Sequence, residues 1–288
     1  MTEGADVSFV HLGITINHLK SSISVFGFRI AFYGIIIGIG MLAGLYMAQK
    51  DARRRGQDPE LYLDFALYAI IFSIIGARLY YVIFDWELYK DNPIEIFNLR
   101  GGGLAIYGGI IGAVLTLIVF TKVRKVSFFS MADTGCIGLI TGQIIGRWGN
   151  FFNCEAFGGY TDSLLAMRIR RALVNDNMLN ADVLNHRIVE NGVEYIQVHP
   201  TFFYESCWNL CLLLFMLWFR RYKKYDGQML WIYLLGYGIG RFWIESLRTD
   251  QLILFGTGLP VSQALSLVLI LVAAGNLIWR GYRHRQKT

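Results

Sequence analysis

Residues 132–155, ADTGCIGLITGQIIGRWGNFFNCE, decide the fold of this chain. The segment up to residue 145 is mostly apolar or small, whereas residues 146–155 bring an arginine, two asparagines and a glutamate together with glycines. The apolar part has the character of a membrane-spanning helix, in which a charge costs about 2.5–3.5 kcal/mol at mid-bilayer. The polar end of this span therefore needs partners or a function.

The composition indicates a membrane protein. Of the 288 residues, 55% are hydrophobic and only 17% are charged, against about 25% charged residues in a typical soluble domain. The net charge of +6 does not indicate nucleic-acid binding, because the basic residues lie in short clusters between apolar runs, as they do beside membrane spans.

About seven transmembrane helices are predicted, since a hydrocarbon core of about 30 Å needs roughly 20 helical residues. The apolar segments cover residues 26–48, 63–84, 104–121, 132–148, 204–219, 228–245 and 259–279. We therefore expect an all-α polytopic membrane protein that forms a single integral membrane domain over residues 1–288. The stretch VSFVHLGITINHL before the first span is interpreted as an interfacial amphipathic segment.

Four basic clusters predict the orientation in the membrane. They fall on one side only if there are seven spans and the N-terminus lies outside. The C-terminus is then cytoplasmic, and the polar end of the fourth span faces outward. The clusters are Lys50, Arg53, Arg54 and Arg55; Lys122, Arg124 and Lys125; Arg220, Arg221, Lys223 and Lys224; and Arg280, Arg283, Arg285 and Lys287.

One long hydrophilic segment, residues 158–198, lies between the fourth and fifth spans. Within it, the Asn191-Gly192 pair stands between alternating residues, which is a β-hairpin signal. This segment is predicted to be a small extracytoplasmic α+β head.

Several charged and polar residues lie in or at the edges of the apolar spans. One interpretation is that they form ion pairs between helices, and the i, i+4 spacing of Arg241 and Glu245 suits such a pair. The other is an anion site, because guanidinium groups bind phosphate oxygens in a bidentate manner. The shared depth of three such groups favours a phospholipid headgroup site, to which Asn150 and Asn153 could donate. The residues are Arg78, Arg147, Glu155, His199, Tyr204, Glu205, Arg241, Glu245 and Arg248.

Two further features have a structural and a functional interpretation. The glycines of GGGLAIYGGIIG, residues 101–112, could permit close helix packing, or could shape a loop beside a headgroup with Tyr107 pointing into it. Cys154 could be a nucleophile, but no histidine base stands near it in the sequence. No disulfide can be argued, and neither a metal nor another cofactor is expected, because no ligand spacing for one is present.

The stretch GRWGNFFNCEAFGG, residues 146–159, resembles the signature G-R-x-G-N-F-x-N-x-E-x-x-G of the phosphatidylglycerol–prolipoprotein diacylglyceryl transferase family. The stretches FRIAFYG, with Arg29 and Tyr33 as an arginine and tyrosine of the first span, and GARLYYVIF, HPTFFYE and GRFWIESLR are also similar to that family. The fixed types of the signature are Gly146, Arg147, Gly149, Asn150, Phe151, Asn153, Glu155 and Gly158.

The resemblance implies an enzyme of the bacterial cytoplasmic membrane that carries out the first step of lipoprotein maturation. Such an enzyme moves the diacylglyceryl group of phosphatidylglycerol to the lipobox cysteine thiol of a preprolipoprotein, forms a thioether and releases glycerol phosphate. Its partners would be phosphatidylglycerol, the signal peptides of preprolipoproteins and the lipid bilayer, with no nucleic acid. The catalytic residues would be Arg147, Arg241, Tyr107, Glu155 and Glu245. Residues that bind phosphatidylglycerol would be Arg147, Asn150, Asn153, Tyr33, Gly158, Arg241 and His199.

The group that accepts the thiol proton is left open by the sequence. Some family members have a histidine where this chain has Tyr107, and a tyrosine of pKa about 10 is a poor base at neutral pH. Glu155, Glu245 or the released phosphate could take the proton instead.

Two other functions remain alternatives. A transporter or channel could use the buried arginines and glutamates as an ion path, but it would predict internal repeats, and the sequence contains none that we recognise. A non-catalytic lipid-binding protein could use the same residues, but it would not require Arg147 and Arg241 together.

Overall fold

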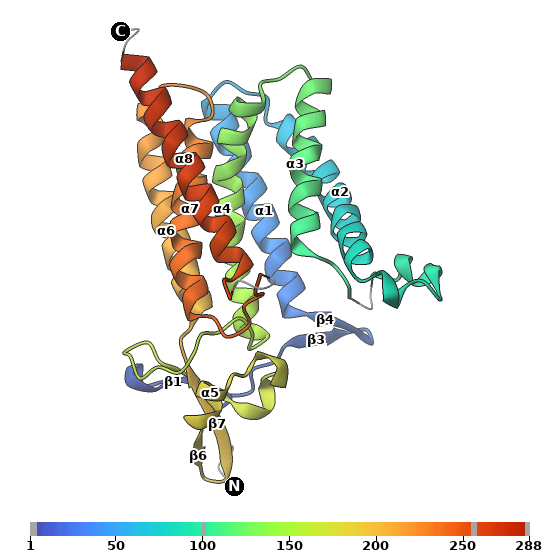
Figure 1. Ribbon diagram of the computed structural model, residues 1–288, viewed down its shortest axis with the longest axis vertical. Coiled ribbons are helices and arrows are strands. Elements are labelled where there is room, and N and C mark those ends of the chain that lie inside the picture. The colour runs from blue at the N-terminus through green and yellow to red at the C-terminus, as the bar shows by residue number, and fades with distance from the viewer. Residues whose placement is uncertain (1–4, 100–101, 255–257, 286–288) are drawn as a thin grey trace. The chain divides into compact units, whose positions relative to one another are not determined.

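The computed structural model describes residues 5–99, 102–254 and 258–285, and most of them are helical (Figure 1). The chain forms two compact units, one from residues 1–44 and 136–288 and the other from residues 45–135. Two helices run through both units, namely α1 (Phe32–Arg54) and α4 (Phe128–Phe152).

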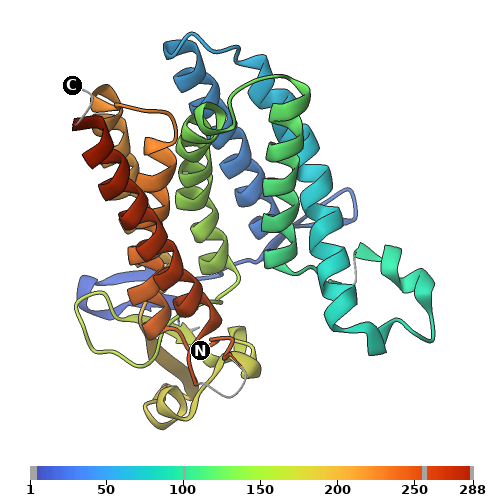
Figure 2. The same ribbon diagram turned by 45° about the horizontal axis from the view of Figure 1, so that its top comes forward.

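The unit of residues 45–135 is built around the helix pair α2 (Glu60–Phe84) and α3 (Ile106–Val123), which lie side by side (Figures 1 and 2). A Cβ atom added to Gly112 would lie 2.5 Å from the carbonyl oxygen of Phe72, and one added to Gly108 would meet the carbonyl oxygen of Gly76. These contacts support the helix-packing interpretation of the glycine-rich segment, of which Gly101 lies outside the described residues.

Arg78 on α2 is buried, and its partners are backbone groups of the segment that follows α2. Five carbonyl oxygens accept from its guanidinium over 2.5–3.2 Å, and they belong to Glu95, Ile96, Asn98, Gly102 and Gly103. Arg78 therefore does not form the interhelical ion pair that the sequence suggested. Carbonyl oxygens of the loop between α2 and α3 bind its guanidinium instead, and this holds the loop against α2.

Six of the described helices, α1, α2, α3, α4, α6 (Thr201–Phe219) and α8 (Val261–Arg285), are long and apolar enough to cross a membrane. Helix α7 (Gln228–Leu247) packs against α6 and α8 and has a similar length, but it carries Arg241 and Glu245 and is not among those six. The protein is thus a polytopic membrane protein, and α7 fits the seventh predicted span by length only.

The predicted start of the first span, at residue 26, is wrong. Ser22–Val25 (β3) and Phe28–Ala31 (β4) form an antiparallel hairpin, and α1 begins only at Phe32. Arg29, expected in the first span, lies in β4. The apolar residues of this hairpin run without a break into those of the helix, so composition alone does not separate the two.

The small head has a five-stranded antiparallel sheet in the order β2-β1-β5-β7-β6. Two of its strands come from the N-terminal segment, so the interpretation of that segment as an interfacial amphipathic stretch is wrong. The predicted α+β segment, residues 158–198, supplies the other three strands and a short helix. The strands are β1 (Val7–Phe9), β2 (Ile14–Ile16), β5 (Met167–Arg170), β6 (Ile188–Glu190) and β7 (Val193–Val198), and the helix is α5 (Ala181–Asn185).

The head is joined to the helices by one apolar core. Phe151 near the end of α4 and Phe202 at the start of α6 are buried against Val7, Ile169 and Ile196 of the sheet. The predicted hairpin turn at Asn191-Gly192 is confirmed, since it joins β6 to β7 with φ angles of 51° and 77°. The sheet therefore holds in place both the end of α4, which contains the polar motif, and the start of α6.

Candidate active site

Most of the polar residues that the sequence singles out lie on or beside α6, α7 and the part of α4 from residue 136 onward, which belong to one compact unit. Ser206 of α6 donates to the carbonyl oxygen of Ile144 on α4 over 2.9 Å, and the Gln143 amide of α4 donates to the Tyr233 hydroxyl of α7 over 2.9 Å. These bonds hold the three helices together within about two turns of Arg147, Glu205 and Arg241.

Glu205 joins the two arginines. Its Oε1 lies 2.5 Å from Nη2 of Arg147, and its Oε2 lies 3.3 Å from Nη1 of Arg241. The Glu205 side chain is 4% exposed, and those of the arginines are 22% and 15% exposed. A nearly buried carboxylate of this kind keeps its charge only with cationic partners, so its two oxygens determine where both guanidinium groups lie.

A second carboxylate extends the cluster toward the end of α7. Glu245 Oε2 lies 2.6 Å from Nη2 of Arg241 and 4.0 Å from Nε of Arg248. Burial alone would raise the pKa of Asp250, but the hydrogen bonds and charge of Arg248, 2.7 Å away, outweigh burial and hold that pKa below its usual range. The predicted i, i+4 pair of Arg241 and Glu245 is therefore present as one part of a longer row.

The row contains as many guanidinium groups as carboxylates, and the carboxylates use only some of its N–H donors. Each guanidinium has five N–H groups, and the carboxylates bind only some of those on the two central arginines. The arrangement can therefore receive one additional anion between groups already held in position. The three guanidinium groups are those of Arg147, Arg241 and Arg248, and the three carboxylates are those of Glu205, Glu245 and Asp250.

The end of α4 turns sharply to place Glu155. Cys154 and Ala156 have positive φ angles of 49° and 55°, which non-glycine residues adopt at some cost. Asn150 holds Glu155 twice: its side-chain amide donates to Glu155 Oε1 over 2.8 Å, and its carbonyl oxygen accepts from the Glu155 amide over 3.0 Å. Asn150 thus positions a carboxylate just beyond the helix.

Tyr33 connects this turn to the arginine cluster. Its ring packs on Gly149, where an added Cβ would lie only 2.8 Å from the ring. Both Glu155 and Arg147 lie near enough to act on its hydroxyl electrostatically. Any larger residue at 149 would displace this ring, which accounts for the glycine next to Asn150 in the motif.

Gly158 and His199 meet at the entry to α6. The Gly158 amide donates to the His199 carbonyl over 2.9 Å, and a Cβ at 158 would lie 2.9 Å from the carbonyl oxygen of Leu247 at the end of α7. The His199 ring is hydrogen-bonded to the Tyr204 hydroxyl at 3.2 Å, and burial lowers the pKa of His199. His199 is therefore a neutral residue at the edge of the cluster at neutral pH.

Two predicted site residues, Asn153 and Tyr107, are located by their backbone. Asn153 follows the end of α4, and its backbone amide donates to the Gly149 carbonyl over 3.2 Å. Tyr107 is the second residue of α3 and belongs to the other compact unit. The roles of both residues remain predictions from the sequence.

The sequence singles out Glu205 as a polar residue in an apolar span but gives it no catalytic or binding role, and it does not single out Tyr237. The Tyr237 hydroxyl lies close enough to the Arg147 guanidinium for the two groups to interact. A carboxylate in the apolar stretch HPTFFYES was a usable signal, because a buried charge needs a partner. The sequence does not indicate which helices supply its partners, which are Arg147 of α4 and Arg241 of α7.

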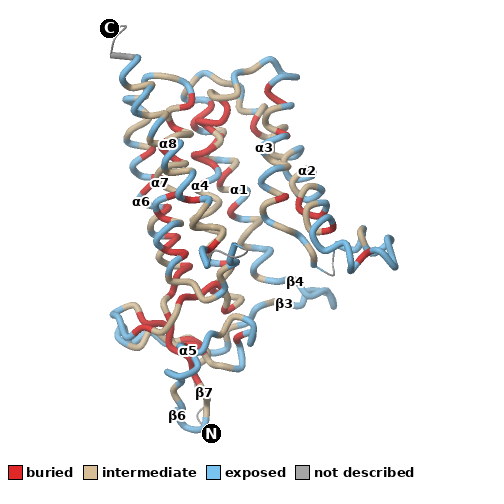
Figure 3. The backbone as a smooth tube through the Cα atoms, in the orientation of Figure 1, coloured by how far each residue is buried: buried red, intermediate tan, exposed pale blue. Residues whose placement is uncertain are grey.

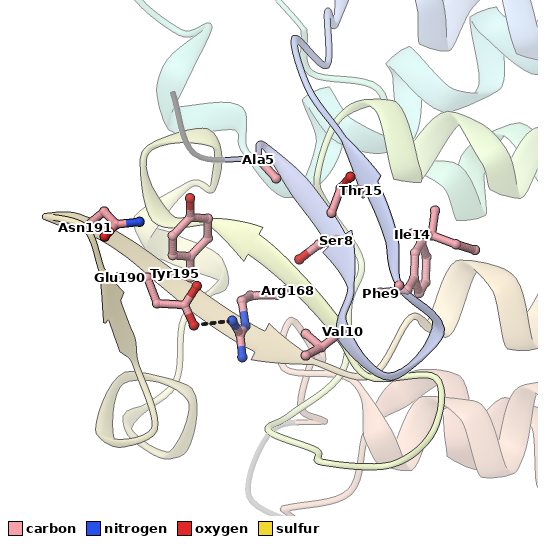
Figure 4. A pocket seen from close by; sticks show the side chains of 11 residues that line it. Ala5, Ser8, Phe9, Val10, Ile14, Thr15, Arg168, Glu190, Asn191 and Tyr195 are labelled. Carbon is pink, nitrogen blue, oxygen red and sulfur yellow. Dashed lines mark hydrogen bonds and ion pairs between the residues drawn. The ribbon is translucent and has the colours of Figure 1, made fainter. Parts of the chain in front are cut away.

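A separate hollow of about 280 Å³ lies on the outer, polar face of the head sheet (Figure 4). Its main charge is already compensated, because Arg168 donates to Glu190 over 2.6 Å. None of the predicted site residues lines it. Those that do are Ala5, Ser8, Phe9, Val10, Gly13, Ile14, Thr15, Arg168, Glu190, Asn191 and Tyr195.

Membrane-length helices, together with a cluster of arginines and carboxylates that lies between α4, α6 and α7, define a membrane protein with a largely buried charged site. A family model described as prolipoprotein diacylglyceryl transferase matches residues 20–279. The chain therefore belongs to the prolipoprotein diacylglyceryl transferase family.

Curated relatives agree with this assignment. The chain is 42% identical to the phosphatidylglycerol–prolipoprotein diacylglyceryl transferase of Bacillus cytotoxicus over 246 residues. These aligned residues make up 85% of this chain and 86% of that protein. Identity is also 42% to the proteins of the same name from Halalkalibacterium halodurans, over 88% of this chain and 82% of the relative, and from Clostridioides difficile, over 86% and 90%. The similarity thus spans most of both chains in each comparison.

Cys154 is expected to be unreactive in the folded protein. Burial, together with the negative charges of Asp6 and Glu155, raises the pKa of its thiol to about 11, so about one molecule in a thousand carries the thiolate at pH 8. A water-soluble maleimide at pH 8 should leave Cys154 unmodified in the native protein and modify it after denaturation in detergent, as read by mass spectrometry. Equal modification in both states would contradict the burial of this side chain.

Proposed function

We propose that this chain transfers the diacylglyceryl group of phosphatidylglycerol to the lipobox cysteine thiol of a preprolipoprotein. Family membership and the names of its relatives support the two substrates. The observation that carries the proposal is that Glu205 holds Arg147 and Arg241 at one place. Two guanidinium groups fixed together form a site for a phosphate that gains charge as it leaves.

In the transfer, one C–O bond breaks and one C–S bond forms. The thiol loses its proton, and the thiolate attacks the glycerol carbon that carries the phosphate. The electrons of the broken bond go to the phosphate oxygen, so glycerol phosphate leaves with one more negative charge than the phosphodiester had. Arg147 and Arg241 bind that phosphate, and Asn150, Asn153, Tyr33, Gly158 and His199 complete the lipid site around it.

The proton of the thiol needs an acceptor. When Glu245 takes a proton, it gives up an ion pair with Arg241, whereas Glu155 gives up a hydrogen bond from the neutral Asn150 amide. Because the contact given for Glu155 is with a neutral amide and that for Glu245 is with a guanidinium, we propose Glu155 as the acceptor. Tyr107 is proposed to lie beside the substrates as a hydrogen-bonding residue.

We further propose that the enzyme lies in the bacterial cytoplasmic membrane with its N-terminus and head outside and its C-terminus in the cytoplasm. The basic clusters at the C-terminal ends of α1, α3, α6 and α8 support this orientation, since Lys and Arg gather on the cytoplasmic side. Lys287 of the last cluster lies outside the described residues. The charge row would then lie near the outer leaflet, where the acceptor cysteine follows its signal-peptide helix.

The two arginines are expected to be needed individually. Arg147→Lys and Arg241→Lys keep the charge but lose the planar fork, so each should reduce thioether formation by about 10²-fold or more. The measurement uses the full-length protein, a lipobox peptide and vesicles that contain phosphatidylglycerol. Arg187→Lys is the matched control, because the Arg187 side chain is 61% exposed in the head, where it pairs with Glu194.

Full activity of both cluster variants would refute the phosphate role of the arginines. A wild-type protein that binds phosphatidylglycerol without any transfer would instead indicate a lipid-binding protein. Folding of each variant is checked by its thermal unfolding in detergent.

Glu205→Gln should separate the effects on binding and on turnover. The variant removes one negative charge from the row, so an anionic lipid should bind at least as well and KM should not rise. A neutral amide does not hold two guanidinium groups in place, so kcat should fall by about tenfold or more. An increase in KM at unchanged kcat would show that Glu205 does not act through the two arginines.

A further inference from the structure

The β3–β4 hairpin is an apolar ribbon exposed on the surface. Phe26 at its tip is 98% exposed and Phe28 is 74% exposed. Such contiguous exposure is unusual for side chains in contact with water. A hairpin of two strands is also at best marginally stable in water, so this ribbon needs a surface to lie on.

The pairing of the two strands makes the ribbon amphipathic. Ile23 is opposite Ile30, and Val25 is opposite Phe28, so these four side chains share one face. The other face carries the pair of Ser24 and Arg29 and the pair of Ser22 and Ala31. The apolar face would be satisfied by hydrocarbon, and the opposite face suits polar headgroups.

The place of the ribbon in the chain puts it at the edge of the bilayer. Helix α1 begins at Phe32, directly after β4, and the Phe32 amide donates to the Ser21 carbonyl over 2.9 Å, which closes the base of the hairpin. Figure 3 shows the ribbon exposed along its length where it enters α1. Its outer edges carry backbone groups that hydrocarbon does not satisfy, so the ribbon belongs in the interfacial layer.

The charge of this segment indicates which lipids it meets. No aspartate or glutamate occurs from residue 7 to residue 50, whereas Lys20 and Arg29 are exposed at the base and on the polar face of the ribbon. Each basic residue near an anionic leaflet contributes about 1 kcal/mol of attraction. An anionic lipid surface therefore complements the ribbon in both charge and polarity.

We propose that the β3–β4 ribbon is a membrane-interface element that places Ile23, Val25, Phe28, Ile30 and the tip Phe26 in the boundary between headgroups and acyl chains, with Arg29 toward anionic headgroups. The proposal rests on α1 being a membrane span and does not depend on the proposed reaction. Its consequence is positional: the ribbon ends two residues before Tyr33, which packs on Gly149 of the polar motif, so it sets the depth at which this part of the site lies.

Adjacent residues on the two faces provide the test. The exposed Cys207 and Cys211 are replaced by Ala, while Cys136 and Cys154 are buried. Single cysteines are then introduced by Val25→Cys on the apolar face and Ser24→Cys on the polar face, and are labelled with an environment-sensitive fluorophore. The full-length proteins are reconstituted in vesicles whose lipids carry nitroxide quenchers at shallow or deep acyl positions. Val189→Cys, on the exposed strand β6 of the head, is the control in the same protein.

The label at residue 25 should show blue-shifted emission and be quenched most strongly by the shallow nitroxide. The labels at residues 24 and 189 should be quenched much less. Equal quenching at residues 24 and 25, or none at 25, would overturn the proposal. A blue shift at residue 25 without quenching by any lipid would also overturn it, because a protein surface would then cover the ribbon. If quenching at residue 25 does not increase with the phosphatidylglycerol content at low salt, the headgroup role of Arg29 is wrong.

Discussion

The placement of both central arginines depends on one buried carboxylate. Glu205 extends from α6 and binds Arg147 of α4 with one oxygen and Arg241 of α7 with the other. Removing one partner from a buried ion pair typically costs about 3–5 kcal/mol, because the remaining charge has nowhere else to go. The three helices are therefore tied to one geometry at this depth, and the apolar core beneath the head sheet holds the ends of α4 and α6 in the same place.

This constraint matters for catalysis because it is present before any lipid arrives. Guanidinium groups that are already fixed do not have to reorganise while charge grows on a leaving phosphate. The carboxylates that position them also cancel their charge, so the lipid proposed to bind there would not have to compete with a large excess of positive charge for other anions. The balance explains why carboxylates accompany arginines in a site proposed for an anion.

Much of this could be predicted from the sequence, for reasons that are local. Apolar length marked the helices, the spacing of Arg241 and Glu245 marked a pair on one face, and Asn191-Gly192 marked a turn. The features that the sequence did not predict depend on contacts between residues far apart in the chain. Strands β1 and β2 join a sheet whose other strands lie some 150 residues later. The carbonyl partners of Arg78 and the two arginines of Glu205 are likewise brought close only by folding. The hairpin before α1 was missed because its apolar residues continue those of the helix.

A double-mutant cycle on Arg147 and Arg241 tests the central claim most directly. Values of kcat/KM for thioether formation are compared among the wild-type protein, Arg147→Lys, Arg241→Lys and the double variant, all in the same phosphatidylglycerol vesicles. If Glu205 makes the two guanidinium groups one unit around one phosphate, the double variant should lose little more than the worse single variant. A loss equal to the product of the two single losses would show that the arginines act independently and would contradict the account.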